Sequence, residues 1–144
     1  CGRRGCFEAY ASASALVRQT RDAMAAHPES KMWELCKGSA DNADGRTVFD
    51  GMRQGDETAK EVVKRYLHYL AEGIANIVNV FRPQAVLIGG GISAEGEALT
   101  LPLRKMVDTK ILGHSRYAPV TIGAASLGND AGLVGAAMLA KEIK

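Results

Sequence analysis

The chain has 144 residues, a formal net charge of +2, 47% hydrophobic residues and 24% charged residues. These values are typical of a single globular domain. Lys and Arg are scattered along the sequence, which excludes a concentrated nucleic-acid surface, and no apolar run approaches the roughly 20 residues of a membrane-spanning helix. The three cysteines are too few for a disulfide-rich secreted domain and favour a reducing, cytoplasmic compartment.

The chain begins with two cysteines that flank a short turn bounded by glycines, Cys-Gly-Arg-Arg-Gly-Cys. Thiolates bind zinc, and the glycines would let the backbone turn tightly enough for Cys1 and Cys6 to reach one ion. A structural zinc site needs four ligands, and no later Cys or His stands at a ligand spacing. We therefore expect further ligands before residue 1 and interpret the chain as part of a longer protein. From spacing alone, a zinc site and a simple glycine turn are equally supported, and a disulfide is a third alternative.

The next segments are predicted to be helical. Apolar residues recur at helical spacing from Glu8 to Ala26, and Pro28 ends this pattern. The sequence then predicts a short helix over 31–37, a polar loop over 39–46 and another short helix over 47–53.

The longest predicted helix begins after Asp56, whose side chain can accept hydrogen bonds from the first free backbone N–H groups. Apolar residues then follow at helical spacing, and Pro83 ends the helix. The residues of this apolar pattern are Ala59, Val62, Val63, Tyr66, Leu67, Leu70, Ile74, Ile77, Val78 and Phe81.

The rest of the chain alternates predicted strands and helices. Residues 84–88 are a short apolar run, which predicts a buried parallel strand. A helix over 94–112, restarted or kinked at Pro102, a second strand over 118–124 and a last helix over 129–143 follow. This alternation indicates an α/β lobe built from packed layers.

Three consecutive glycines, Gly89, Gly90 and Gly91, follow the first predicted strand. Glycines at the carboxyl end of a strand let a ligand approach the backbone, at the edge where open α/β sheets bind ligands. Glu95 and Glu97, which we place in the first turn of the following helix, would oppose a triphosphate there. The loop therefore suits the adenosine end of a nucleotide better than its phosphates. A simple tight turn without a ligand is the alternative, and a glycine triplet on its own favours it.

These motifs and their order resemble one protein family. Segment 1–8 is similar to the second half of the signature Cys-x-Cys-Gly-x-x-Gly-Cys-x-Glu of the ROK family, which comprises repressors, open reading frames of unknown function and sugar kinases. Residues 9–18 resemble the bacterial glucokinase branch of that family. Segments 86–93 and 127–137 resemble later family motifs, so the resemblance covers essentially the whole chain.

The resemblance implies a fold and a division of the chain. The fold would be α/β, a ribonuclease-H-like, actin-like ATPase lobe with a helical insertion, preceded by a truncated zinc knuckle. Residues 1–8 would form the partial zinc motif, residues 9–55 the helical insertion, and residues 56–144 the α/β core on the nucleotide side.

The resemblance also implies roles for individual residues. One His and three Cys bind a structural Zn2+ in the family, and Cys1 and Cys6 match the last two of these cysteines. Glu8 matches a Glu that accepts hydrogen bonds from sugar hydroxyls, although its position alone favours a solvated carboxylate in the first turn of a helix. The glycine triplet 89–91 matches the loop on the adenosine side of the ATP site.

The implied function is that of an ATP-dependent glucokinase, which transfers the γ-phosphoryl group of ATP to the 6-hydroxyl of glucose with Mg2+ as cofactor. The general-base Asp of the family has no match in this chain and would lie upstream, so we expect the chain alone to be inactive. The family also implies a homodimer. The alternative is the sugar-sensing lobe of a ROK transcriptional repressor, the one interpretation that would bring a nucleic-acid partner.

Overall fold

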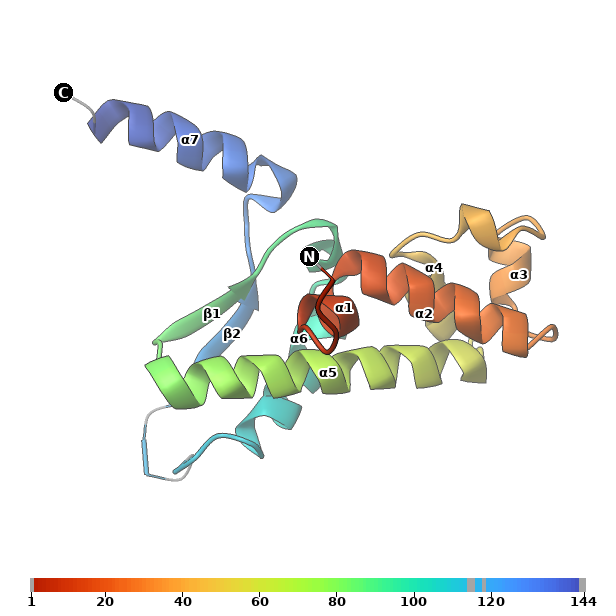
Figure 1. The fold of residues 1–144 in the computed structure, drawn as a ribbon, viewed down its shortest axis with the longest axis horizontal. Helices are drawn as coiled ribbons and strands as arrows, with labels where there is room; N and C mark the ends of the chain where they lie inside the picture. The colour runs from red at the N-terminus through yellow and green to blue at the C-terminus, as the bar shows by residue number, and fades with distance from the viewer. Residues whose placement is uncertain (1, 114–115, 118, 143–144) are drawn as a thin grey trace.

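A computed structural model describes residues 2–113, 116–117 and 119–142 of the chain (Figure 1). Its α-helices are α1 (Glu8–Ala11), α2 (Ala13–Ala26), α3 (Met32–Leu35), α4 (Thr47–Arg53), α5 (Glu57–Phe81), α6 (Glu97–Asp108) and α7 (Ala131–Glu142). Its strands are β1 (Ala85–Ile88) and β2 (Thr121–Ala124), and short 3-10 turns are η1 (Ala40–Asn42), η2 (Gly91–Glu95) and η3 (Gly128–Asp130). The second half alternates helices and strands, as predicted.

Helix α5 runs along the lobe and carries much of its hydrophobic core (Figure 1). Asp56 caps this helix as predicted, because its carboxylate accepts a hydrogen bond of 2.7 Å from the backbone N–H of Ala59. The helix ends at Arg82, which adopts a left-handed conformation. Most residues of the predicted apolar pattern are buried, but two near that end are not, since Ile77 is 43% and Phe81 is 75% exposed.

The prediction of one helix from Glu8 to Ala26 is wrong, because Ser12 divides the segment into α1 and α2. Ser12 has an extended backbone, with φ −81° and ψ 167°, and its hydroxyl accepts a hydrogen bond of 3.1 Å from the N–H of Ala15. Serine is among the best N-cap residues, so it starts a new helix here. Helix α1 is left as a single turn in front of α2.

The other helices of the first half surround the N-terminal part of α5. Helices α2 and α4 both pack against α5, and α3 packs against α4. Helix α4 has the predicted bounds, whereas α3 is shorter than the expected range 31–37. The predicted polar loop contains the 3-10 turn η1. These helices form a bundle at one end of the lobe (Figure 1).

Strands β1 and β2 pair in parallel, with Ala85 opposite Thr121 and Ile88 opposite Ala124. This pairing confirms the predicted parallel strand. The prediction that the strand is buried is wrong, because β1 alternates exposed and half-buried residues and Leu87 is 65% exposed. The described part of the sheet holds two strands.

Helix α6 packs against both α5 and β2 and buries Leu99, Leu103 and Val107. It begins at Glu97, later than expected, and Pro102 lies inside it without ending it. Helix α7 projects away from the rest of the lobe, and its described side chains are exposed (Figure 1).

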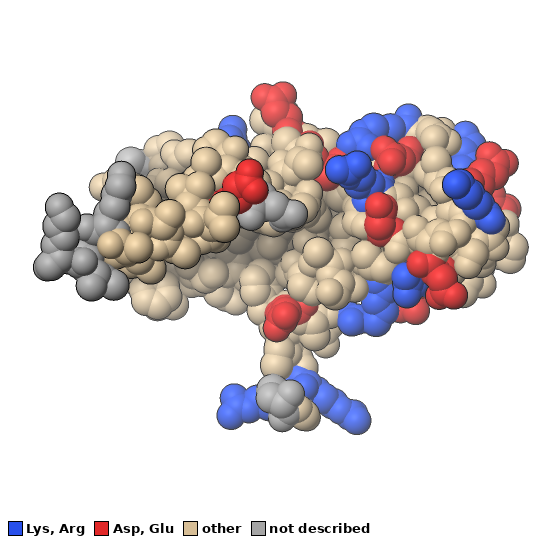
Figure 2. Space-filling model, turned by 90° about the horizontal axis from the view of Figure 1, so that it is seen from above, with Lys and Arg blue, Asp and Glu red and all other residues tan. Residues whose placement is uncertain are grey.

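The surface differs between the two ends of the lobe. Figure 2 shows Lys, Arg, Asp and Glu gathered mainly over the helical end, with both signs of charge intermixed, and few of them toward α7. None of the helices in the described ranges is long and apolar enough to cross a membrane.

Candidate functional site

The segment before α1 bends at Arg4 and Gly5, where the sequence predicts a tight turn. Gly2 and Gly5 have φ values of 76° and 77°, in the left-handed region that glycine adopts readily. Cys6 is exposed and its thiol is free, whereas Cys1 lies outside the described residues. Within residues 2–113, 116–117 and 119–142, no group of three or more potential metal ligands occurs. The turn and the accessible thiol of Cys6 fit one side of a zinc site, and zinc binding stays a prediction.

Phe7 anchors this turn to α5 through a contact that the sequence analysis missed. A Cβ atom at Gly73 of α5 would overlap ring atoms Cε2 and Cζ of Phe7 and would lie 2.6 Å from Cδ2. The ring therefore lies directly on the helix backbone, and any side chain at position 73 would displace it. A glycine inside a regular amphipathic helix is the sequence signal that could have indicated such a contact. The anchor holds the chain between Cys6 and Glu8.

Glu8 is the first residue of α1 and is exposed, so its carboxylate is accessible to a ligand. Its backbone carbonyl accepts a hydrogen bond of 3.1 Å from the N–H of Ser12, which links it to the start of α2. An ionised carboxylate accepts hydrogen bonds from hydroxyl groups strongly and with a preferred direction. The side chain thus has the chemistry and the access that a sugar contact needs.

The glycine loop lies at the carboxyl end of β1, as predicted. Gly90 has φ 78° and ψ −175°, and its carbonyl accepts two hydrogen bonds from Ser93, one from the hydroxyl at 2.7 Å and one from the N–H at 3.0 Å. No described atom lies within 4 Å of a Cβ atom built at Gly89, Gly90 or Gly91. The backbone of the loop is therefore both held in place and open on its outer side.

The placement of Glu95 in the first turn of the following helix is wrong. Glu95 ends the 3-10 turn η2, and only Glu97 belongs to the first turn of α6. The carboxylate of Glu95 is 7% exposed and forms an ion pair with Arg53 of α4. Arg53 also pairs with Asp50 at 2.5 Å. The charge of Glu95 is thus compensated by Arg53, and this pair ties the helical bundle to the segment behind the glycine loop.

A cavity of about 210 Å³ lies beside the glycine loop. Three segments line it, namely Ala13 and Leu16 of α2, residues 44–46, and Gly91, Ile92 and Glu95. These segments lie far apart in the sequence, and the fold brings them to one space. The sequence indicates the glycines but not residues 44–46, because a polar loop carries no signal of where it will pack.

Hydrogen bonds give the loop 44–46 a fixed shape. One carboxylate oxygen of Asp44 accepts hydrogen bonds from the N–H of Arg46 at 2.9 Å and from the N–H of Thr47 at 3.0 Å. Burial raises the pKa of Asp44, but these hydrogen bonds outweigh it and hold the pKa below its usual value. The ionised Asp44 therefore shapes this wall of the cavity and starts α4.

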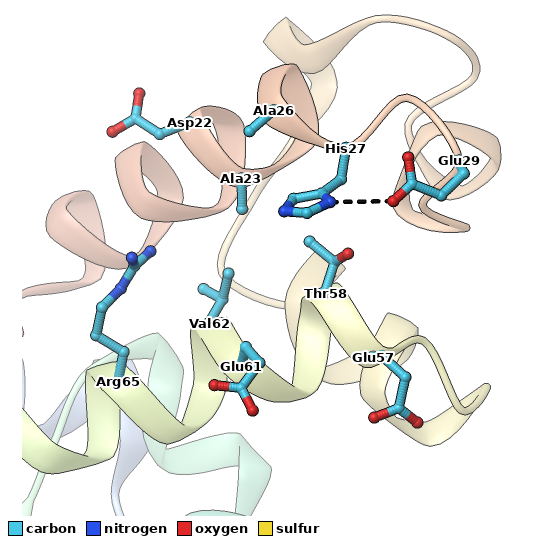
Figure 3. Close-up of a pocket in the computed structure, with 10 residues that line it drawn as sticks. All are labelled: Asp22, Ala23, Ala26, His27, Glu29, Glu57, Thr58, Glu61, Val62 and Arg65. Carbon is cyan, nitrogen blue, oxygen red and sulfur yellow. Dashed lines mark hydrogen bonds and ion pairs between the residues drawn. The ribbon is translucent and has the colours of Figure 1, made fainter.

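A second cavity, of about 530 Å³, lies between α2 and the N-terminal part of α5 (Figure 3). His27 points into it, and its Nδ1 lies 3.0 Å from Oε1 of Glu29. Thr58 and Val62 of α5 form the opposite wall. None of the site residues that the sequence predicts lines this cavity, so it is separate from the candidate site.

The fold and the site together define a class of protein. It is an α/β lobe with an open glycine loop at the carboxyl end of a parallel strand and an exposed carboxylate after a cysteine-containing turn. The sequence model of the ROK family matches residues 1–143, so the chain belongs to this family.

The relatives of the chain include two bacterial glucokinases. The chain is 41% identical over 142 residues to a glucokinase of Thermotoga maritima. The alignment covers 99% of this chain and 44% of that protein. It is 37% identical over 144 residues to a glucokinase of Streptomyces coelicolor, covering 99% of the chain and 45% of that protein.

A solved structure agrees with the fold. It is a ROK family glucokinase from Streptomyces griseus in complex with glucose and AMPPNP, with a TM-score of 0.89 and 38% identity, covering 99% of this chain and 46% of that one. This similarity confirms the predicted α/β fold. The chain spans less than half the length of the relatives that it matches.

Proposed function

We propose that the full-length protein carrying this chain is an ATP-dependent glucokinase, which phosphorylates the 6-hydroxyl of glucose. The observation that carries the proposal is the similarity, over 99% of the chain, to a glucokinase structure whose ligands are glucose and AMPPNP. In this proposal the chain supplies a ribonuclease-H-like, actin-like lobe, with residues 9–55 as a helical insertion and residues 56–144 as the core on the nucleotide side.

Glu8 is the proposed sugar ligand. Its carboxylate accepts hydrogen bonds from glucose hydroxyls, and it is supported by its exposure at the start of α1 and by its match to the family signature. Two contacts hold this start of the helix, since Phe7 lies against Gly73 and the carbonyl of Glu8 is bonded to Ser12. A fixed acceptor selects the orientation of the sugar that presents its 6-hydroxyl to ATP.

Residues 89–91 are the proposed contact with the adenosine end of ATP. The open outer side of the loop lets the nucleotide approach the backbone, and the neighbouring cavity of about 210 Å³ offers space for part of the nucleoside. Glu97, in the first turn of α6, disfavours phosphates at that helix. The phosphates and Mg2+ therefore extend away from α6, toward residues that this chain does not contain.

Cys1 and Cys6 are proposed to bind a structural Zn2+ together with one His and one Cys from upstream. Zinc in such a closed site supplies rigidity rather than chemistry. Cys6 would then hold the turn immediately before Phe7 and Glu8. Metal analysis of the full-length protein tests this role: about one zinc per chain is expected in the wild type, and Cys6→Ser is expected to lose it. Full zinc retention by that variant would contradict the assignment.

The chemical step needs groups outside this chain. Phosphoryl transfer rests mainly on positioning and on stabilising charge, with a base that accepts the proton of the attacking hydroxyl. We propose an upstream Asp as that base, so the isolated chain is expected to be inactive. A homodimer in the cytoplasm completes the proposal. The sequence has no cluster of basic residues that would indicate a nucleic acid or a membrane as a partner.

Measuring ADP release by the full-length protein with ATP and a panel of hexoses tests the proposed function. We expect turnover that depends on glucose and is faster with glucose than with mannose, fructose, allose or N-acetylmannosamine. No turnover with any hexose, from folded protein that still binds glucose, would contradict the kinase and favour the sugar-sensing lobe of a repressor.

A further inference from the structure

Helix α1 is a single turn, and several of its backbone carbonyl groups have no hydrogen-bond partner within the helix. The carbonyl of Glu8 and those of the two preceding residues, Cys6 and Phe7, accept hydrogen bonds from the N–H groups of residues 9–12. The break at Ser12 then leaves the next three carbonyls without partners in the helix. Unpaired carbonyls are normal at a helix end, where water usually binds them.

In this chain three side chains donate hydrogen bonds to those carbonyls. A terminal nitrogen of Arg18 donates to the carbonyl of Ala9, and the side-chain amide of Gln19 donates to the carbonyl of Tyr10 at 3.0 Å. The hydroxyl of Tyr66 donates to the carbonyl of Ala11 at 2.9 Å. The donors come from α2 and α5, so one set of bonds fixes α1 to both long helices. The carbonyls that they bind belong to Ala9, Tyr10 and Ala11.

Two of the three donors are buried, which makes these bonds rigid. Tyr66 is 1% and Gln19 is 8% exposed. Burial raises the pKa of Tyr66 to about 12, so its hydroxyl keeps its proton and remains a donor at any physiological pH. Buried side chains lose little further freedom on making such bonds, because packing already restricts them.

A turn of four residues is not stable as an isolated helix. The orientation of α1 is therefore set by its neighbours, and the same turn begins with Glu8. Without the three donors, α1 would retain the Phe7 contact and the packing of the Tyr10 ring against Tyr69. It would lose the hydrogen bonds that fix its last three carbonyls. The carboxylate of Glu8 would then sample more directions than a single sugar orientation requires.

We propose that Tyr66 and Gln19, with Arg18, are positioning residues that hold α1 and so aim Glu8 at the sugar. The inference rests on the proposed function, since it assumes that Glu8 contacts the sugar. None of the three is proposed to touch the substrate. Their effect reaches the sugar through the backbone of α1 alone, and this gives the inference a specific kinetic signature.

The test uses the full-length protein and the variant Tyr66→Phe, which removes the hydroxyl and keeps the ring. One lost hydrogen bond predicts an increase of about three- to tenfold in the KM for glucose. The KM for ATP is expected to stay unchanged. Gln19→Met provides a second, independent variant with the same expected result.

Thr20→Val is the matched control. Thr20 is fully buried and its hydroxyl donates to the carbonyl of Leu16 at 2.9 Å, within α2. This variant therefore also loses one buried hydroxyl, but the hydrogen bond that it removes lies within α2 and does not involve α1. Its KM for glucose is expected to match the wild type, and an increase equal to that of Tyr66→Phe would overturn the inference.

Repeating Tyr66→Phe in a Glu8→Ala background separates the inference from the proposed function. The increase in KM for glucose is expected to disappear in that background, because there is no carboxylate left to position. Additive effects of the two changes would overturn the inference while leaving the sugar contact intact. No effect of Glu8→Ala by itself would instead refute the sugar contact, and with it the inference.

Discussion

Replacing Gly73 by Ala sets two effects of similar size against each other. In the interior of a helix, Ala is more favourable than Gly by about 0.8–1 kcal/mol. At Gly73, however, the new methyl group would overlap the Phe7 ring, which must move off α5. Phe7 is 45% exposed, so it gains about half of the roughly 1.5–3 kcal/mol that full burial of its side chain contributes.

The two terms nearly cancel, so the free energy of unfolding of Gly73→Ala is expected to change by less than about 1 kcal/mol. The displaced ring nevertheless shifts the turn that leads into Glu8. We therefore expect the KM for glucose to rise by about three- to tenfold while stability hardly changes. Urea denaturation and steady-state kinetics of the full-length protein measure the two quantities separately.

A double-mutant cycle with Phe7→Ala tests the cause. Once the ring is removed, Gly73→Ala has nothing to displace and is expected to stabilise the protein by about 0.8–1 kcal/mol. The two backgrounds should therefore differ by about 1 kcal/mol in the effect of the same substitution. An equal gain in stability in both backgrounds would refute the contact between Phe7 and Gly73.

Three further predictions concern the cap of α5 and the segment behind the glycine loop. In addition to its cap bond, Asp56 accepts hydrogen bonds from the Ser30 hydroxyl at 2.9 Å and from the Lys31 N–H at 2.6 Å. Asp56→Ala is therefore expected to lower the free energy of unfolding, measured by urea denaturation, by about 2–4 kcal/mol. Burial raises the pKa of Asp56, but the hydrogen bonds from Ala59, Lys31 and Ser30 outweigh it and hold the pKa below its usual value. The stabilisation is therefore present above about pH 4 and is lost as the pH falls through the lowered, folded-state pKa. Denaturation at pH 7 and pH 3 should show a larger loss on acidification for the wild type than for Asp56→Asn, and an equal loss would contradict the role of ionised Asp56. Arg53→Met leaves the buried carboxylate of Glu95 without its partner. The KM for ATP is therefore expected to rise by about three- to tenfold, and the KM for glucose is expected to stay unchanged. An unchanged KM for ATP would show that the ion pair does not support the glycine loop.

The sequence predicted those parts of the fold that local rules determine. Asp56 as a cap, the helix that follows it and the glycines after a parallel strand all depend on neighbouring residues, and the structure confirms them. Ser12 was missed because apolar spacing continues across it, whereas its hydroxyl is free to cap a second helix. The burial of β1 was wrong, since burial depends on layers that spacing cannot supply.

In the candidate site, too, the sequence predicts the local features but not the contacts between distant segments. The signature residues Cys6 and Glu8 and the glycine triplet were recognisable from the sequence, because their identity and order match a family. Their supports were not, because each one joins distant segments: Phe7 with Gly73, and Tyr66 with α1. Such contacts depend on packing between helices, and single positions give little sign of it.

The central claim is that Glu8 binds glucose in an ATP-dependent kinase. The most direct measurement compares kcat/KM for glucose in the full-length wild type, in Glu8→Gln and in a control, Glu57→Gln, which changes an exposed first-turn Glu of α5. Loss of a charged acceptor predicts a fall of about 100-fold for Glu8→Gln and none for the control. Equal values of kcat/KM in all three proteins would contradict the account.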